Sequence, residues 1–204
     1  MTIFSHPKSF QELLEYSDGS EALYELTEGE LRIVVPESEV NSYITDCLRE
    51  RLIPFFSRRL VKIQEIYVEV APLPGMPLNR DPDLVVLAPE HLGLMSASGK
   101  MAISATMPPP LLIAEVVSPY SGPMDPNFTR DYSDKPQQYA IRRVSEYWII
   151  DPQRSLIELN WDPDQSKRIY TGQATFKGKD RMISQLAELS SLKVTAANIL
   201  EPDL

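Results

Sequence analysis

Two carboxylates and a lysine occupy positions in the sequence from which they could form a metal-assisted hydrolytic site. Asp83 opens one predicted buried strand, Glu115 lies inside the next, and Lys135 stands near the start of the helix that follows. Carboxylate oxygens are the ligands that a hard divalent cation such as Mg²⁺ prefers, and the carbonyl of Val116 could add a third ligand. A lysine beside such an ion could orient a water or stabilise charge on a phosphate. The pattern therefore predicts a site for Mg²⁺ (or Mn²⁺) at Asp83, Glu115 and Val116, with Lys135 as the catalytic cation.

A purely structural interpretation of the same residues stays open at this point. A carboxylate inside an apolar strand is costly to desolvate unless a positive group meets it. For Glu115 that group could be Arg130 or Lys135 in a structural ion pair instead of a metal. Asp83 could end a turn or pair with Arg80. Pairs of carboxylates on strands are common, so the spacing alone does not decide between these interpretations.

Two further acids are secondary candidates for the site. Glu39, near the start of a predicted long helix, could add a carboxylate, although acids are also favoured in any first helical turn. Asp131 lies four residues before Lys135, and Lys135 is followed directly by Pro136. Because proline suits the first turn of a helix and not its interior, we expect the helix to start near Lys135. Asp131 and Lys135 would then not share one helical face.

The elements that must position these residues follow from hydrophobic periodicity. Apolar residues at three- and four-residue steps predict an amphipathic helix over 37–56, which Pro54 would kink or end early. Short apolar runs predict central strands in "DLVVLAP", "LLIAEVV" and "EYWIIDP". The aliphatic face of "LVKIQEIYVEVAP" changes sides near Glu65, which indicates a bulge or a change of burial there.

Turn and cap signals complete the predicted architecture. "ALYELTEGELRIVV" is typical of a hairpin with its turn at Glu28-Gly29, and "SLIELNW" should pair with the preceding strand after a turn at 151–154. We also expect a short helix in "SFQELLEYS", strands in "RIYTG" and near 182–189, and a last helix in "TAANIL" capped by Thr195. The Pro-rich segment 121–128 could be a mobile lid or a substrate loop. The order of elements predicts an α/β (α+β) fold with a central mixed sheet flanked by helices and with extra hairpins at its edge.

Composition limits the classes of protein that this chain can represent. With 204 residues, 43% hydrophobic and 24% charged, it fits one soluble globular domain. No apolar run is long enough for a membrane span, and no secretion signal is visible. One cysteine, Cys47, agrees with a reducing cytoplasm, and two histidines make a His-rich zinc site hard to build. A net charge of −9 argues against non-specific coating of DNA, but it allows contact over a small local patch.

Four blocks of sequence carry a family resemblance. "PDLVVLAPEHL", "LLIAEVVSP", "RDYSDKPQQYA" and "SEYWIIDPQ" occur in this order, after "YELTEGEL". In this respect the chain resembles the Uma-two-type restriction endonuclease family of the PD-(D/E)XK nuclease superfamily, which is abundant in cyanobacteria. The resemblance runs over 23–159 and implies a restriction-endonuclease-like core, with 160–204 adding C-terminal strands and a short helix to the same domain.

The resemblance also implies an activity and assigns residues to it. It implies Mg²⁺-dependent cleavage of phosphodiester bonds in DNA, with Asp83 and Glu115 as the metal carboxylates. Val117 stands where the superfamily has its lysine, and Lys135 matches a lysine that has moved to the following helix. Tyr139 is similar to the family's helix tyrosine, and Arg130 is the next cation in line if Lys135 does not reach the site.

Two function classes remain after this reasoning. The first is a metal-dependent endonuclease, which would cut both strands most simply as a homodimer. The second is a catalytically inactive binding or scaffold protein that keeps the nuclease fold. The arrangement of Asp83 and Glu115 discriminates between them, because carboxylates on opposite faces of the sheet could not hold one ion.

Overall fold

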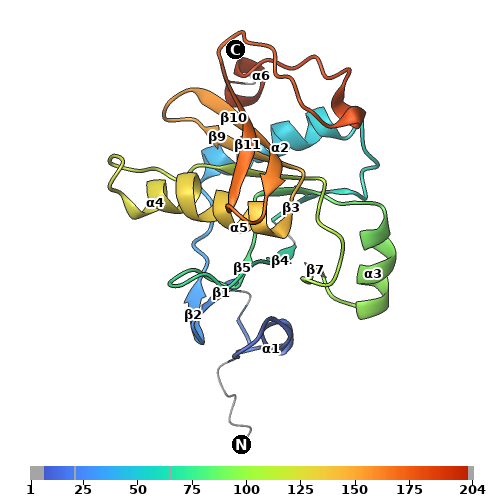
Figure 1. Ribbon diagram of the computed structural model, residues 1–204, viewed down its shortest axis with the longest axis vertical. Coiled ribbons are helices and arrows are strands. Elements are labelled where there is room, and N and C mark those ends of the chain that lie inside the picture. The colour runs from blue at the N-terminus through green and yellow to red at the C-terminus, as the bar shows by residue number, and fades with distance from the viewer. Residues whose placement is uncertain (1–6, 21, 65, 202–204) are drawn as a thin grey trace, which may run out of the picture.

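The central element of the fold is a six-stranded mixed sheet (Figure 1). The computed structural model describes residues 7–20, 22–64 and 66–201. Strands β8 and β9 are parallel, and every other neighbouring pair in this sheet is antiparallel. In spatial order the strands are β11 (Ile169–Lys177), β10 (Leu156–Asp164), β9 (Glu146–Asp151), β8 (Leu112–Val116), β6 (Leu84–Val86) and β3 (Val61–Ile63). This arrangement confirms the predicted mixed α/β fold.

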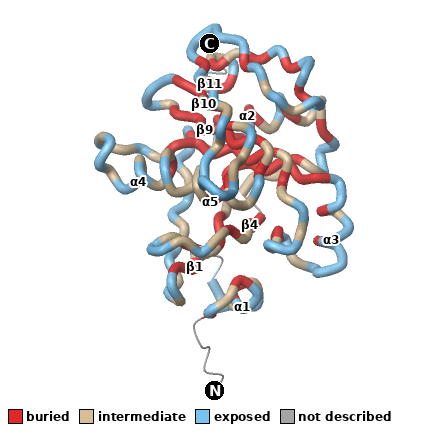
Figure 2. The backbone as a smooth tube through the Cα atoms, viewed as in Figure 1, coloured by how far each residue is buried: buried red, intermediate tan, exposed pale blue. Residues whose placement is uncertain are grey.

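Helices cover both faces of the sheet. Helix α2 (Glu39–Leu52) ends two residues before Pro54, shorter than the predicted 37–56, because proline cannot continue the helix. Its residues Ile44 and Leu48 pack in one buried cluster with alternate residues of β6 and β8. Helix α5 (Lys135–Arg142) contributes Tyr139 to the cluster on the opposite face. Figure 2 shows the buried residues concentrated along the strands between these two layers.

The segment that was expected to change sides near Glu65 divides between two sheets. Residue 65 itself lies outside the described residues. Gln64, just before it, has a positive φ of 46° and ends β3 at the edge of the central sheet. The chain continues as β4 (Tyr67–Glu69) in a separate three-stranded sheet with β5 (Asn79–Arg80) and β7 (Ala102–Ile103). Helix α3 (Glu90–Ser98) connects β6 to β7.

The N-terminal elements follow the predicted signals. Helix α1 (Phe10–Glu15) starts after Ser9, whose side chain accepts a hydrogen bond from the N–H of Glu12. Strands β1 (Tyr24–Thr27) and β2 (Glu30–Ile33) form an antiparallel hairpin. At its turn Glu28 and Gly29 have φ values of 51° and 84°, as a two-residue hairpin turn requires.

The C-terminal region corrects one prediction. The β10–β11 hairpin and the last helix, α6 (Ala197–Leu200), form as expected, and Thr195 Oγ1 accepts from the N–H of Asn198. The strands predicted near 182–189 do not form; this stretch holds a short 3-10 helix, Ala187–Leu189, beside one isolated bridge from Arg181 to Thr195. Buried Glu146 accepts from Ser184 Oγ at 2.8 Å, so a side chain and not a strand ladder fixes this segment.

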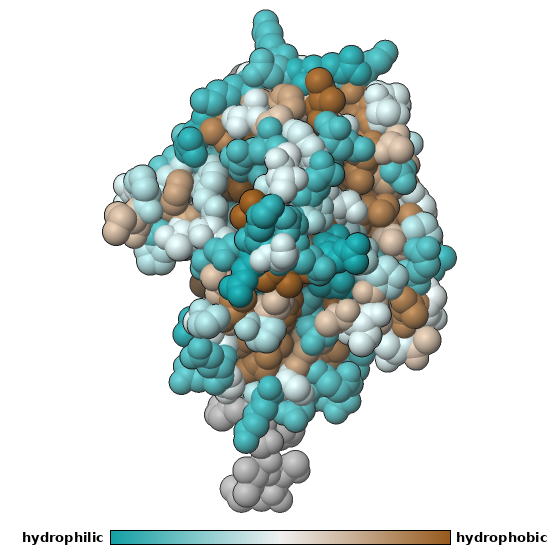
Figure 3. Space-filling view, in the orientation of Figure 1, coloured by the Kyte–Doolittle hydropathy of each residue, from teal (hydrophilic) through white to brown (hydrophobic). Residues whose placement is uncertain are grey.

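The surface is mixed in character. On the face shown in Figure 3, hydrophilic side chains are interrupted by small, separate hydrophobic patches. None of the helices in the described part of the chain is long and apolar enough to cross a membrane.

Candidate active site

Asp83 and Glu115 face one another across neighbouring strands. Strands β6 and β8 pair antiparallel with Leu84 opposite Ala114, and one further step in this register places Asp83 opposite Glu115. Side chains of directly opposite residues point to the same face of a sheet. Both residues line a pocket of about 420 Å³. They therefore lie on one face, the arrangement that a shared ion requires.

A backbone hydrogen bond orients the buried carboxylate of Asp83 in this pocket. Its Oδ2 accepts a hydrogen bond of 2.7 Å from the N–H of Val116, and the residue is only 4% exposed. Burial raises the pKa of Asp83 well above its usual range, and the nearby charges of Glu115 and Glu37 raise it further. The structure thus uses the backbone N–H of Val116 to orient a carboxylate, while the predicted role of its carbonyl as a metal ligand stays a prediction.

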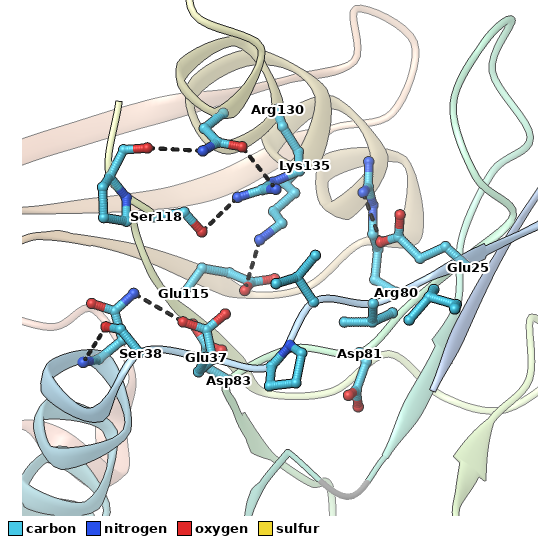
Figure 4. Close-up of a pocket in the computed structure, with 17 residues that line it drawn as sticks. Glu25, Glu37, Ser38, Arg80, Asp81, Asp83, Glu115, Ser118, Arg130 and Lys135 are labelled. Carbon is cyan, nitrogen blue, oxygen red and sulfur yellow. Dashed lines mark hydrogen bonds and ion pairs between the residues drawn. The ribbon is translucent and has the colours of Figure 1, made fainter. Parts of the chain in front are cut away.

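Glu115 is met by a cation and a phenol. Lys135 Nζ lies 2.9 Å from Glu115 Oε2, and the hydroxyl of Tyr139 donates to Oε1 at 2.6 Å. Figure 4 shows the lysine extending from its helix toward the carboxylate. Of the two partners predicted for Glu115, the structure selects Lys135 over Arg130. Both oxygens of the carboxylate therefore have a partner within the protein.

The helix that carries Lys135 starts earlier than predicted, and the expected separation of Asp131 from Lys135 is wrong. The helix is continuous through three segments: α4 (Pro126–Thr129), the π-helical turn Arg130–Asp134 and α5. Lys135 Nζ lies 3.0 Å from Asp131 Oδ1. The π turn explains how Pro136 is tolerated, because the wider turn relieves the clash between the proline ring and the preceding turn. The carbonyl of Asp131, which would bond the absent N–H, accepts a 3.4 Å bond from the hydroxyl of Tyr147.

Arg130 serves Asp131 and does not contact Glu115. Its guanidinium donates to both oxygens of Asp131, at 2.9 and 3.0 Å, and to Ser118 Oγ at 2.8 Å. Although burial alone would raise the pKa of Asp131, Lys135 and Arg130 hold it at about 2. Burial alone would lower the pKa of Lys135, but the carboxylates of Asp131 and Glu115 raise it above its usual value. Lys135 is therefore a charged ammonium fixed between two carboxylates.

The first-helix acid at the pocket is Glu37, and the prediction of Glu39 is wrong. Ser38 caps helix α2 by accepting from the N–H of Asn41, so Glu39 becomes the first helical residue and is exposed. Glu37 precedes the cap, lines the pocket and accepts from Asn41 Nδ2 at 2.9 Å. Burial raises its pKa, and Glu115 adds to this effect. The serine before the helix was the signal that could have located Glu37.

A second acid that sequence reasoning missed is Asp81. It lines the same pocket, and Figure 4 shows its carboxylate pointing away from the Lys135–Glu115 pair. Burial raises its pKa from 3.8 to about 7, with Glu115 as the largest charge contribution. Arg80, beside it, pairs with Glu25 at 2.9 Å and not with Asp83, which removes the structural pairing considered for Asp83.

The loop that follows β8 forms a fixed wall of the site. Ser118, Pro119 and Asn127 line the pocket. The hydroxyls of Tyr120 and Tyr132 both donate to one oxygen of Asp151, at 2.8 and 2.6 Å. These contacts tie the residues that flank segment 121–128 to strand β9, while its predicted role as a lid or a substrate loop stays a prediction.

The side chains present suit Mg²⁺ with a partly aqueous coordination shell. Within the described residues, no group of three or more His, Cys, Asp or Glu side chains is arranged to hold a metal ion. Mg²⁺ in nucleotide sites is bound by one or two carboxylates and completes its shell with waters and substrate phosphates. Two opposed carboxylates in an open pocket fit that donor set.

Comparison with known proteins places the fold and the family. The model of Uma2, described as "Putative restriction endonuclease", matches residues 10–197. The chain belongs to the Uma2 family. The match to the family model, over residues 10–197, is longer than residues 23–159, over which the sequence motifs indicated the resemblance. No curated protein matches the chain.

One of the solved structures that match this Uma2 member shows the shared fold. It is a protein from Anabaena variabilis described as a putative nuclease belonging to DUF820. The two superpose with a TM-score of 0.66 at 15% identity, over 95% of this chain and 98% of that one. At this identity the likeness shows the fold, and the residues of the pocket must carry the functional argument.

Proposed function

We propose that this protein is a Mg²⁺-dependent endonuclease that hydrolyses phosphodiester bonds in DNA. One observation carries the proposal: Asp83, directly before β6, and Glu115, in the neighbouring strand β8, line a single pocket, with Lys135 Nζ 2.9 Å from Glu115. Membership of a nuclease family supports the same reaction class. Mn²⁺ should substitute for Mg²⁺, since both are bound by oxygen ligands.

The residues of the chain have separable tasks in this reaction. Asp83 and Glu115, with the carbonyl of Val116, would hold the ion, and Glu37 lies beside them. A bound Mg²⁺ would polarise the phosphate and lower the pKa of a coordinated water. Lys135 has three donors, of which two are directed at Glu115 Oε2 and Asp131 Oδ1. The third is available for a phosphate oxygen or for the attacking water.

The acidic chain must meet DNA locally. The net charge of −9 opposes long-range attraction to a phosphate backbone. Lys135, Arg80 and Arg130 nevertheless line the same pocket as the carboxylates. We propose that a bound ion and these cations receive the scissile phosphate, and that the protein acts as a homodimer in the cytoplasm.

An inactive scaffold protein is the competing proposal. It is favoured by one observation: Lys135 and Tyr139 provide a hydrogen-bond partner for each oxygen of Glu115 from within the protein. A structural network of this kind could maintain the fold alone. The two proposals differ in their response to divalent cations.

Nicking of supercoiled plasmid separates them. The wild-type protein is incubated with Mg²⁺, with Mn²⁺ and with EDTA, beside Asp83→Asn, whose amide oxygen can still accept from the N–H of Val116. The matched control is Asp46→Asn, which removes an exposed carboxylate of helix α2. We expect metal-dependent nicking by the wild type and the control and none by Asp83→Asn. Nicking that survives in Asp83→Asn, or its absence from the wild type with both metals, would exclude the endonuclease.

A further inference from the structure

Strand β2 has an edge that is open for pairing. In the described part of the chain the hairpin is a two-stranded sheet, so β2 pairs only with β1. The other edge of β1 is covered: Leu78 N–H donates to the carbonyl of Leu26, and Asn79 Oδ1 accepts from the N–H of Leu26. Figure 1 shows the hairpin at the margin of the molecule, with β2 on its outside. An open edge is a template for pairing with another chain.

The hydrogen-bonding pattern identifies the backbone groups on this edge. The N–H of Val34 donates to the carbonyl of Leu23, so this opposite pair is a hydrogen-bonded one. Hydrogen-bonded and non-hydrogen-bonded pairs alternate along an antiparallel ladder. Val34, Arg32 and Glu30 therefore direct their backbone groups toward β1. Leu31 and Ile33 direct their N–H and C=O groups outward.

Charge selects one register for two copies of this edge. A two-fold axis can centre the pairing on Leu31, on Arg32 or on Ile33. Centring on Arg32 opposes two like charges, and centring on Ile33 opposes Arg32 to Val34. Centring on Leu31 opposes Glu30 to Arg32 of the partner subunit, and does so twice by symmetry. Both side chains are exposed, and opposite charges facing across strands are favourable.

Exposed apolar residues continue from the same edge. Ile33 is 66% exposed and Val35, two residues beyond the end of β2, is 78% exposed. In the register centred on Leu31, Ile33 lies opposite Gly29 of the partner subunit, where the missing side chain leaves room for it. Apolar residues next to an open, self-complementary edge are what a contact between copies would bury.

We infer that the partner of this surface is a second copy of the chain, joined through β2 into a four-stranded sheet in the order β1-β2-β2-β1. The segment 33–36 that continues from β2 lines the candidate active site. Arg32 lies opposite Glu25 in the register of the hairpin, and Glu25 forms an ion pair with Arg80 in the same pocket. The dimer would therefore fix the two active sites relative to one another. Two sites fixed in this way could cut both strands of a duplex. Only this consequence rests on the proposed function.

Sedimentation velocity with charge-swapped variants tests the interface. A contact between two short edges is small, so we expect a reversible dimer that is resolved between about 1 and 100 µM. Arg32→Glu or Glu30→Arg alone opposes like charges twice per dimer and should weaken dimerisation about tenfold to a hundredfold. The double variant Glu30→Arg with Arg32→Glu restores both pairs and should restore the dimer. Arg58→Glu, an exposed charge reversal outside the hairpin, is the control and should leave it unchanged.

The outcomes are distinct. A wild type that stays monomeric, single variants that dimerise normally, or a double variant that stays as weak as the single ones would each overturn the interface. Far-UV circular dichroism confirms that each variant is folded. Asp83→Asn should dimerise like the wild type, so loss of nuclease activity and loss of the interface are recognised separately.

Discussion

Lys135 Nζ lies 2.9 Å from Glu115 Oε2 and 3.0 Å from Asp131 Oδ1, so one ammonium joins a strand of the central sheet to the helix that covers it. The lysine side chain is 12% exposed, and the two carboxylates are 2% and 1% exposed. Charges buried to this extent depend on one another, because removing one leaves the others without compensation. The same three residues are central to the proposed chemistry.

Lys135→Met should reduce both stability and cleavage. An exposed ion pair contributes about 0–1 kcal/mol, whereas breaking a buried pair costs about 3–5 kcal/mol. We expect a loss in the free energy of unfolding nearer the second range, and nicking slowed about a hundredfold in the variant that remains folded. Lys135→Arg should recover stability better than activity, since a planar guanidinium does not replace a compact ammonium. Urea unfolding and single-turnover nicking measure the two effects; wild-type cleavage by Lys135→Met would remove the lysine from the mechanism.

Asp131 should act through Lys135. Asp131→Asn removes the charge that orients the ammonium and should slow nicking about tenfold, on the scale of one charge-assisted hydrogen bond. In the background of Lys135→Met the same change should have little further effect on the rate. The coupling is measured by a double-mutant cycle on the nicking rate and on stability in parallel. Additive effects on the rate would mean that Asp131 has a role independent of the lysine.

Removal of the Tyr139 hydroxyl should loosen Glu115. The bond to Glu115 Oε1 is 2.6 Å long and fully buried, and hydrogen bonds to charged groups contribute about 1.5–3 kcal/mol. Tyr139→Phe should lose stability in that range in the metal-free protein, and saturating Mg²⁺ should restore part of it by neutralising the carboxylate. Tyr147→Phe is the matched control, since it removes a buried hydroxyl with a longer bond of 3.4 Å to a neutral carbonyl. Equal losses in the two variants would argue against a special role for Tyr139.

The stability of the metal-free protein should fall as the pH rises above about 4. Burial raises the pKa of Asp81 from 3.8 to about 7 and also raises that of Asp83 well above its usual range, so the folded state binds protons that the unfolded chain has already released. For each group, the loss of stability grows between its pKa in the unfolded chain and its pKa in the folded state. The loss is complete above the folded-state pKa. For Asp81 the window is about pH 4 to 7, and Asp81→Asn should flatten the curve of melting temperature against pH there.

A divalent cation should reverse this trend. Ion binding requires the deprotonated carboxylates and stabilises the folded state in proportion to its occupancy. The rise in melting temperature on adding Mg²⁺ or Mn²⁺ should therefore be larger at pH 8 than at pH 6, and absent in Asp83→Asn. A melting temperature that does not respond to millimolar Mn²⁺ at pH 8 would contradict the metal site.

The sequence by itself determined the features that depend on neighbouring residues. Ser9 caps the first helix and Glu28-Gly29 turns the first hairpin, because both signals act within four residues. Apolar runs located the central strands, since a strand buried on both faces must be apolar throughout. Asp83 and Glu115 stood out for the complementary reason, that a carboxylate in such a strand needs an explanation.

Only the tertiary structure decided how these features combine at the site. By local rules, Pro136 predicts the start of a helix. In the structure a π turn precedes it, and the hydroxyl of Tyr147, from strand β9, bonds the carbonyl of Asp131, so the helix continues past Pro136. Asp131 and Lys135 consequently share one face, which no pattern of spacing indicates. The segment near 182–189 was predicted to form strands, but it is held by Glu146, which accepts from Ser184 Oγ and from the N–H of Gln185. Contacts between residues far apart in sequence provided the energy that overrode local preference, and such contacts become visible only when the chain is folded.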